Sequence, residues 1–150
     1  MFSYKYPHPA VTADCIVFAG EAPDLQVLLI ERRHDPCQGC WAFPGGFMNI
    51  DETADDAARR ELREETGLEV GEMIQVGAFT RVDRDPRERV ITIAYYALLP
   101  HTAEVRGADD ARQARWFALS ALPALAFDHA EILHKALTQL TTTSCNSPHP

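Results

Sequence analysis

Apolar residues in the first part of the chain fall into two short runs that predict adjacent β-strands. The runs cover residues 10–19 and 25–32, and the segment 20–24 between them is rich in turn-forming residues. Residues 27–30 are apolar on both faces of a strand, which is typical of the middle of a sheet. The pattern therefore predicts a hairpin whose second strand is buried and ends at Glu31, Arg32 and Arg33.

Three further strands and two helices follow from the same kind of pattern. Segments 73–82 and 89–99 read as strands, with clear alternation over 90–96, and 114–119 reads as a short final strand. A helix over 53–66 is predicted because Thr53 can cap its start and Gly67 can supply a left-handed C-cap. Asp128 can cap a second helix, with Glu131 as its capping-box partner. An apolar stripe supports that helix: Ile132, Leu133, Ala136, Leu137 and Leu140.

Length and composition fit one compact domain. The chain has 150 residues, of which 46% are hydrophobic and 24% charged, and we expect a single domain over 1–142 and a mobile tail over 143–150. A net charge of −8 argues against binding to a nucleic-acid polymer or an acidic membrane. No apolar run approaches membrane-spanning length and no leader pattern is visible, so a cytoplasmic protein is expected.

Three glutamates on the first predicted helix suggest chemistry rather than structure. Glu61 is spaced i,i+3 from Glu64 and i,i+4 from Glu65, and like charges at these spacings destabilise a helix. A divalent cation would reverse this effect, because Mg²⁺ selects carboxylate oxygens together with phosphate oxygens of a substrate. The alternative is a solvated acidic face on which Arg60 pairs with Glu64.

The residues around the glutamates carry a specific motif. Glycines precede the helix, at the place where a backbone can approach a ligand closely. The stretch from Gly46 to Leu68 resembles the Nudix box, GX5EX7REUXEEXGU with U aliphatic, at every defined position. The matching residues are Gly46, Glu52, Arg60, Glu61, Leu62, Glu64, Glu65, Gly67 and Leu68.

The resemblance implies an α/β/α sandwich with a mixed β-sheet and a hydrolase acting on a nucleoside diphosphate linked to another moiety. It implies a Mg²⁺ or Mn²⁺ cofactor held by Glu61, Glu64 and Glu65, with a backbone contact from Gly46. Arg60 would orient the glutamates, whereas Glu52 would brace the loop or touch a metal-bound water. Gly67 has a structural role in the motif.

The general base lies outside the motif in many family members. Asp110, a few residues before Trp116, is the preferred candidate here, ahead of Glu104 and Asp109. A solvated turn over 107–110 is the alternative explanation of these acids.

The resemblance to the substrate branch rests on 9–18, 41–47 and 84–90, which are similar to ADP-ribose pyrophosphatases. Arg32, Arg84 and Arg87 are the candidate phosphate ligands, and the alternative is that these arginines mark a strand end and neutralise neighbouring acids. Hydrolysis of an oxidised nucleotide or of dihydroneopterin triphosphate remains open. So does a non-catalytic ADP-ribose sensor, although such regulators usually carry a degraded box and a winged helix after the domain. The partner is a small nucleotide, and family members often form homodimers through sheet edges.

Two remaining features of the sequence carry simpler expectations. Cys37 and Cys40 form a C-x2-C beside His34, but no second ligand pair follows, so we expect reduced, metal-free cysteines rather than a zinc site. His129 and His134 on the second helix are given no function, because nothing pairs with them in the sequence.

Overall fold

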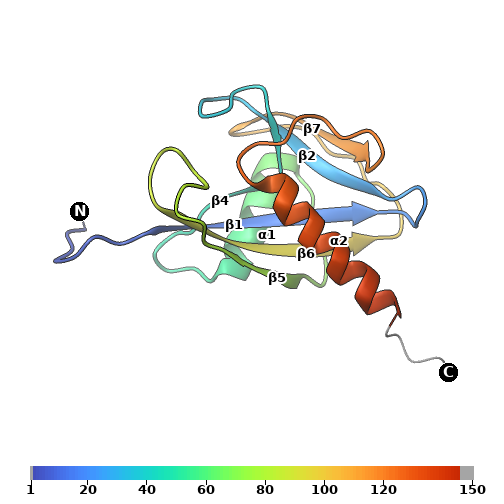
Figure 1. Ribbon diagram of the computed structural model, residues 1–150. Helices are drawn as coiled ribbons and strands as arrows, with labels where there is room; N and C mark the ends of the chain where they lie inside the picture. The colour runs from blue at the N-terminus through green and yellow to red at the C-terminus, as the bar shows by residue number, and fades with distance from the viewer. Residues whose placement is uncertain (1, 146–150) are drawn as a thin grey trace.

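The computed structural model describes residues 2–145 and confirms the predicted α/β/α sandwich (Figure 1). Its strands form one seven-stranded mixed sheet, with β3-β2-β1-β6-β5 as the central order, β4 paired with β1 and β7 paired with β2. The element bounds are β1 Ala10–Ala19, β2 Gln26–Arg32, β3 Trp41–Ala42, β4 Gly45–Phe47, α1 Ala54–Thr66, β5 Ile74–Phe79, β6 Val90–Leu99, β7 Ala111–Ala118 and α2 His129–Cys145.

The two helices cover opposite faces of the sheet (Figure 1). On the α1 side the core joins Ala57, Ala58 and Leu62 to alternate residues of β1. On the α2 side it joins Ile132, Leu133 and Ala136 to Ile16 and Phe18, the other face of the same strand. Because successive side chains of a strand point to opposite faces, β1 supplies both cores at once.

The sheet opens between β1 and β2, and this opening places the candidate site. The two strands pair antiparallel only at Phe18–Val27 and Ala19–Gln26, next to the turn that joins them. Farther along, β1 pairs with β4 over Thr12–Asp14, and β2 pairs with β3 at Ile30 and Glu31. The diverging strands leave a cavity beside the amino-terminal half of β1.

The predicted helix α1 is confirmed with both of its caps. The Thr53 hydroxyl accepts a hydrogen bond from the Asp56 backbone N–H at 3.1 Å, and Gly67 adopts the left-handed conformation with φ 77°. Helix α2 begins after Asp128 as predicted and continues to Cys145, so the chain is helical three residues beyond the predicted end of the domain at 142. Residues 146–150 of the expected tail lie outside the described residues.

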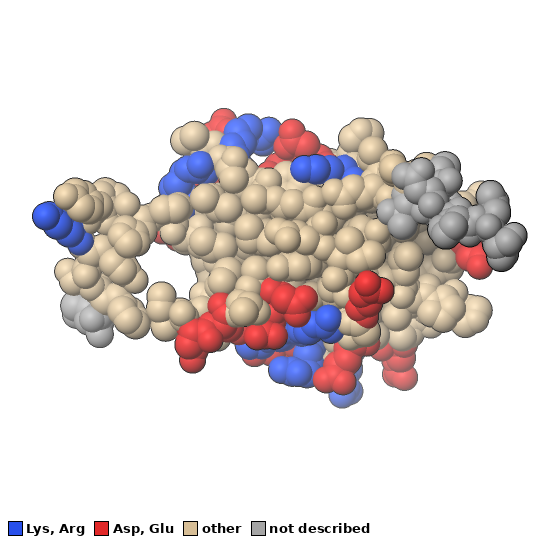
Figure 2. Space-filling view, turned by 90° about the horizontal axis from the view of Figure 1, so that it is seen from below, with Lys and Arg blue, Asp and Glu red and all other residues tan. Residues whose placement is uncertain are grey.

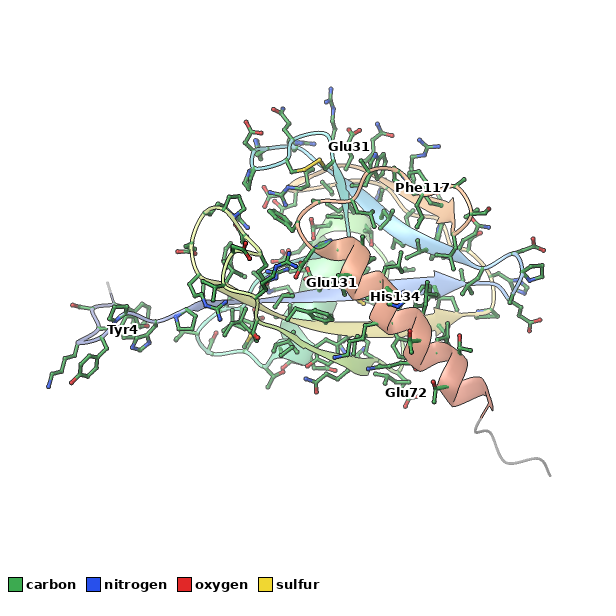
Figure 3. The ribbon with its side chains drawn as sticks, viewed as in Figure 1. Tyr4, Glu31, Glu72, Phe117, Glu131 and His134 are labelled. Atoms are coloured by element: carbon green, nitrogen blue, oxygen red, sulfur yellow. A yellow bond between two sulfur atoms is a disulfide. The ribbon has the colours of Figure 1, made fainter. Side chains whose placement is uncertain are left out.

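Two predictions about side chains near the helices and loops are wrong. The Asp128 carboxylate binds Arg84 rather than capping α2, because that contact neutralises a buried guanidinium. Cys37 and Cys40 form a disulfide, where reduced cysteines were expected (Figure 3). Among the described residues, no group of three His, Cys, Asp or Glu side chains is already gathered as a metal site.

The outer surface carries charges of both signs. In the view from below, acidic and basic side chains lie along the margins of the molecule, and an uncharged band runs between them (Figure 2). The amino-terminal arm extends away from the body and exposes Tyr4 (Figure 3). No described helix is long and apolar enough to span a lipid bilayer.

Candidate functional site

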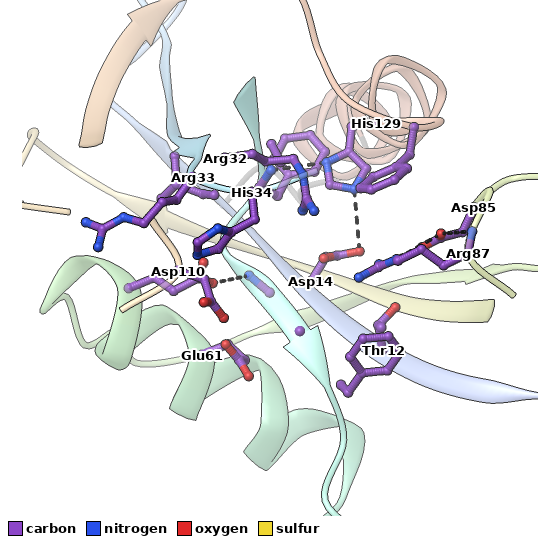
Figure 4. Close-up of a pocket in the computed structure, with 18 of the residues that line it drawn as sticks. Thr12, Asp14, Arg32, Arg33, His34, Glu61, Asp85, Arg87, Asp110 and His129 are labelled. Carbon is purple, nitrogen blue, oxygen red and sulfur yellow. Dashed lines mark hydrogen bonds and ion pairs between the residues drawn. The ribbon is translucent and has the colours of Figure 1, made fainter. Parts of the chain in front are cut away.

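A cavity of about 370 Å³ lies at the opening between β1 and β2 (Figure 4). Its wall brings together α1, the end of β2, the loop 80–89, the start of α2 and residues 44–46, where a bend at Pro44 leads into β4 and which we call the glycine turn. Eight of the predicted site residues line it: Arg32, Gly46, Arg60, Glu61, Glu65, Arg84, Arg87 and Asp110. Glu64, Glu52 and Gly67 are on or beside α1 but do not line this cavity.

The glycine turn is held tightly against α1. The Gly45 backbone N–H donates a hydrogen bond to Glu65 Oε1 at 2.8 Å. A side-chain carbon on Gly46 would lie only 2.6 Å from Glu61 Oε1, and one on Gly45 would collide with the Asp14 carboxylate. Glycine is therefore required at Gly45, where a Cβ would also meet the backbone of β1, and a Cβ at Gly46 would displace the Glu61 carboxylate.

Burial of the glutamates makes their negative charge costly. Glu65 is 3% exposed, and burial raises its pKa to about 9, with the Gly45 hydrogen bond opposing the shift. Burial also raises the pKa of Glu61. A divalent cation beside these carboxylates would offset the cost of burial, and carboxylate oxygens are the ligands that such a cation selects.

Arg60 connects the motif residues to one another. Its guanidinium donates two hydrogen bonds to Glu52, from Nε at 3.1 Å and from Nη2 at 2.6 Å. Its Nη1 donates to Glu61 Oε1 at 2.9 Å and to Glu64 Oε2 at 3.2 Å. Hydrogen bonding to Glu52 raises the pKa of Arg60, and the same bond lowers the pKa of Glu52. Glu52 also accepts the Asn49 backbone N–H at 2.8 Å, which ties the loop before α1 to the same network. Arg60 therefore holds Glu61 and Glu64 in fixed orientations while Glu52 braces the loop.

Two arginines form a cationic side of the cavity. Arg32 lies with its guanidinium carbon 4.9 Å from the centre of the Phe127 ring, and Arg87 lies 5.7 Å from the same ring and 5.2 Å from that of Phe47. Burial lowers the pKa of Arg32, and the nearby Arg87 lowers it further. The Arg32 guanidinium hydrogen-bonds only the Pro36 carbonyl oxygen among the described residues, so its charge has no carboxylate partner within salt-bridge distance there. Both guanidinium groups line the cavity beside the Phe127 ring, and Arg32 in particular can bind an anion there.

Three of the four arginines of loop 80–89, Arg81, Arg84 and Arg87, have different environments. Arg84 makes a buried bidentate pair with Asp128: Nε donates to Oδ2 at 2.9 Å, and Nη2 donates to Oδ1 at 2.7 Å. Arg87 pairs with Asp85 but remains about 40% exposed, and Arg81 pairs with Asp83 and Glu131 on the surface. The expected neutralisation by acids of the same loop thus occurs at Arg81 and Arg87. Arg84 instead pairs with Asp128, which is 44 residues away in the sequence.

Asp110 lies at the exposed rim of the cavity, opposite the start of α2 (Figure 4). It follows Asp109, which has a positive φ of 57°, in a turn closed by the Ala111 backbone N–H and the Ala108 carbonyl. Its backbone carbonyl accepts the Arg33 N–H at 3.3 Å. Asp110 therefore lines the cavity and is also part of an exposed turn, so both interpretations of residues 107–110 describe part of the structure.

Asp14 and His129 were missed in the sequence, yet both line the cavity (Figure 4). His129 is buried and stacks on Phe43, whereas His134 is exposed on the outer side of α2 (Figure 3). No partner for His129 could be recognised in the sequence, because Asp14 lies in β1 and Phe43 follows β3, both far from His129 along the chain. A signal for Asp14 did exist: it is an acid on the face of β1 that Ile16 and Phe18 continue as core.

Comparison with known proteins agrees with the motif and the fold. A family profile described as the NUDIX domain matches residues 8–137. The chain is 43% identical to an ADP-ribose pyrophosphatase of Methanocaldococcus jannaschii over 128 residues, covering 85% of this chain and 73% of that protein. It is 35% identical over 139 residues to the ADPR responsive transcriptional repressor NtrR of Acinetobacter baylyi, covering 90% of this chain and 56% of the repressor.

A solved structure gives the same relationship in three dimensions. The NUDIX domain of Shewanella oneidensis NrtR, crystallised with ADP ribose, superposes with a TM-score of 0.83 at 27% identity, and the match covers 90% of each chain. The Nudix hydrolases depend on divalent metal ions. With a complete motif, a matching profile and the same sandwich, the chain belongs to the NUDIX family and is a Nudix hydrolase.

Proposed function

We propose that this protein hydrolyses ADP-ribose to AMP and ribose 5-phosphate. The observation that carries the proposal is that one cavity is lined both by the carboxylates of Glu61 and Glu65 and by the guanidinium groups of Arg32 and Arg87. Glu61 lies across the cavity from the two arginines (Figure 4). A two-phosphate bridge suits such a cavity, because its oxygens can meet cations from both directions. The pyrophosphatase from Methanocaldococcus jannaschii and the ADP ribose complex of NrtR support this choice of substrate.

The proposed cofactor is Mg²⁺, with Mn²⁺ as the alternative, and its ligands are Glu61, Glu64, Glu65 and the backbone of Gly46. When bound, the cation neutralises phosphate oxygens and increases the acidity of a coordinated water. The chain's own contribution is positional: Arg60 holds Glu61 and Glu64 in place, and the Gly45 N–H holds Glu65. Asp110 is the proposed general base, because it lies at the rim where its carboxylate is accessible to water.

On the cationic side, Arg32 and Arg87 are the proposed phosphate ligands. Arg84 lines the same cavity, but its pairing with Asp128 gives it mainly a positioning role for the start of α2. This assignment changes the sequence-based hypothesis, in which Arg84 was a candidate phosphate ligand together with Arg32 and Arg87.

A second candidate function is ADP-ribose sensing without turnover. The observation that favours it is the similarity to the repressor NtrR over 90% of this chain. The complete set of motif carboxylates favours hydrolysis, because a sensor has no need to hold three glutamates around a cation. The third alternative is a nucleoside triphosphate substrate, such as an oxidised nucleotide or dihydroneopterin triphosphate.

The test is a comparison of substrates at equal concentration with Mg²⁺. We expect kcat/KM for ADP-ribose to exceed that for 8-oxo-dGTP and dihydroneopterin triphosphate by at least an order of magnitude. Efficient pyrophosphate release from a triphosphate, with ADP-ribose left intact, would contradict the assignment. Tight binding of ADP-ribose by calorimetry with no cleavage in Mg²⁺ or Mn²⁺ would identify a sensor.

A further inference from the structure

The floor of the cavity holds a buried carboxylate with unused hydrogen-bonding capacity. Asp14 is 6% exposed and lies in the middle of the cavity (Figure 4). Its Oδ2 accepts the Thr92 hydroxyl at 2.6 Å, which is the one hydrogen bond to this carboxylate from the described residues. A carboxylate offers about four acceptor positions, so a buried one with a single donor is incompletely satisfied.

His129 presents an unused donor beside this carboxylate. Its Nδ1 accepts the Phe43 backbone N–H at 3.1 Å, so the neutral ring carries its proton on Nε2. Burial lowers the pKa of His129, which favours this neutral form. Nε2 lies 3.9 Å from Asp14 Oδ2, beyond hydrogen-bonding distance, and within the described part of the chain it has no hydrogen-bond partner.

The geometry points to a group that can both donate and accept at the same place. We propose that Asp14 and His129 form a hydroxyl-binding pair that recognises the diol of a ribose in the substrate. A hydroxyl can donate to the Asp14 carboxylate while its oxygen accepts from His129 Nε2–H. A phosphate would be repelled by Asp14, and an ammonium group would leave the histidine N–H unpaired.

Neighbouring residues fit a sugar at this position. Thr12 is two residues before Asp14 on the same face of β1, lines the cavity, and adds a hydroxyl that can donate or accept. The Asp14 carboxylate packs directly against Gly45, which joins the proposed metal side. The diol site therefore adjoins the place where the phosphates are proposed to bind. This inference rests on the proposed function, because ADP-ribose carries a ribose on each side of its phosphates.

The experiment compares ADP-ribose with two analogues, each lacking the hydroxyls of one ribose. Tetrahydrofurfuryl-ADP lacks those of the terminal ribose, and the 2′,3′-dideoxyadenosine form of ADP-ribose lacks those of the nucleoside. Kd is measured by calorimetry on metal-free protein, and KM and kcat are measured with Mg²⁺. The variants are Asp14→Asn, which keeps the size of the side chain, and His129→Asn, whose carbonyl can still accept from Phe43 N–H. Asp24→Asn, an exposed acid in the β1–β2 turn, is the matched control.

The expected result is a selective loss. Asp14→Asn should raise Kd and KM for ADP-ribose roughly 10- to 100-fold with a smaller change in kcat, because a hydrogen bond to a charged group is lost. One analogue lacks the hydroxyls that bind Asp14 in ADP-ribose, and the same variant should not weaken binding of that analogue. The analogue that is unaffected therefore identifies which ribose binds at the site. His129→Asn should show the same selectivity with a smaller loss, and Asp24→Asn should match wild type.

Other outcomes overturn the proposal. Equal weakening of all three ligands by Asp14→Asn, or no weakening, would show that the carboxylate does not read hydroxyls. An increased Mg²⁺ requirement with an unchanged Kd for ADP-ribose would assign Asp14 to the cation instead. If wild type neither binds nor cleaves ADP-ribose, the proposed function fails separately. The hydroxyl-binding pair is then tested with the ribonucleotide that wild type does cleave and with its 2′,3′-dideoxy form. Asp14→Asn should weaken binding of the first and not of the second, and equal effects on both would overturn the proposal.

Discussion

The Gly45 backbone N–H donates a 2.8 Å hydrogen bond to Glu65 Oε1, and this bond joins the glycine turn to the last turn of α1. The bond places the buried Glu65 carboxylate directly against the Gly45 backbone, because glycine has no side chain that would keep the two apart. The turn and the helix consequently act as one unit, and small changes in either should alter the positions of the motif carboxylates.

Gly46→Ala tests this close approach. The added Cβ would lie 2.6 Å from Glu61 Oε1, so the carboxylate has to move away from its present position. We expect kcat to fall about 100-fold, in line with the cost of an ångström-scale misplacement, and thermal stability to change little. Gly71→Ala is the control, because an added Cβ there meets no atom within 4 Å. Wild-type kcat for Gly46→Ala would show that the spacing of turn and helix is unimportant.

Glu64→Gln tests the role of the exposed motif carboxylate. Neutralising Glu64 relieves its repulsion with Glu61 but also weakens its exposed pair with Arg60, so stability should change little. Turnover with Mg²⁺ should nevertheless fall by orders of magnitude, because a proposed metal ligand loses its charge. Steady-state kinetics and thermal melts measure both effects. Glu69→Gln, another exposed acid, should behave like wild type; a similar result for Glu64→Gln would remove it from the mechanism.

The Arg84–Asp128 pair should matter chiefly for stability. Both side chains are almost fully buried, and removing one partner leaves the other as an uncompensated charge. Arg84→Ala or Asp128→Asn should therefore lower the free energy of unfolding by about 3–5 kcal/mol in urea titrations. The comparison is Arg81→Ala, which breaks an exposed pair with Glu131 and should cost less than about 1 kcal/mol. Equal losses from the two variants would contradict the structural role of Arg84.

Arg87 should act on substrate binding instead. Arg87→Ala is expected to raise KM for ADP-ribose roughly 10-fold with a smaller change in kcat, because a phosphate contact present in both ground state and transition state is lost. Arg87→Lys should be intermediate, since it keeps the charge but lacks the planar fork. Arg63→Ala removes an exposed arginine that does not line the cavity and provides the control. An unchanged KM for Arg87→Ala would leave the cationic side without its proposed function.

The cysteines make a separate prediction about thiol chemistry. Cys15 is fully buried, and burial raises its pKa to about 12, so it should resist alkylation by iodoacetamide at pH 8 in the native protein. Cys37 and Cys40 should become reactive only after a reductant is added, because they form a disulfide. Peptide mapping by mass spectrometry reports each residue. Labelling of Cys37 and Cys40 without reductant would restore the expectation of free thiols.

Local sequence signals predicted the regular elements well. Helix α1 was predictable because Thr53 and Gly67 mark its ends. Strand β1 was predicted with its observed bounds because its β-rich run stops at the turn-forming segment 20–24. Strands β3 and β4 were missed, because they contain only two and three residues and exist through pairing with β2 and β1. Strand β5 is shorter than predicted and ends at Phe79, before the arginine loop begins.

The candidate site was only partly predictable for a different reason. The motif glutamates lie on one helix, so their spacing alone places them together. Asp14 and His129 meet only because β1 and the start of α2 are neighbours in the folded chain, and the pairing of Arg84 with Asp128 depends on the same packing. Contacts of this kind have no local periodicity, and an acid within an apolar strand was the one available sign.

Identification of the reaction products by ³¹P NMR tests the central claim most directly. ADP-ribose is incubated with wild-type protein and Mg²⁺, with wild type in EDTA, and with Glu64→Gln in Mg²⁺. We predict that the pyrophosphate signals are replaced by those of AMP and ribose 5-phosphate in the first sample and persist in the other two. Unchanged ADP-ribose in all three samples, or equal conversion with and without metal, would contradict metal-dependent hydrolysis of ADP-ribose by this site.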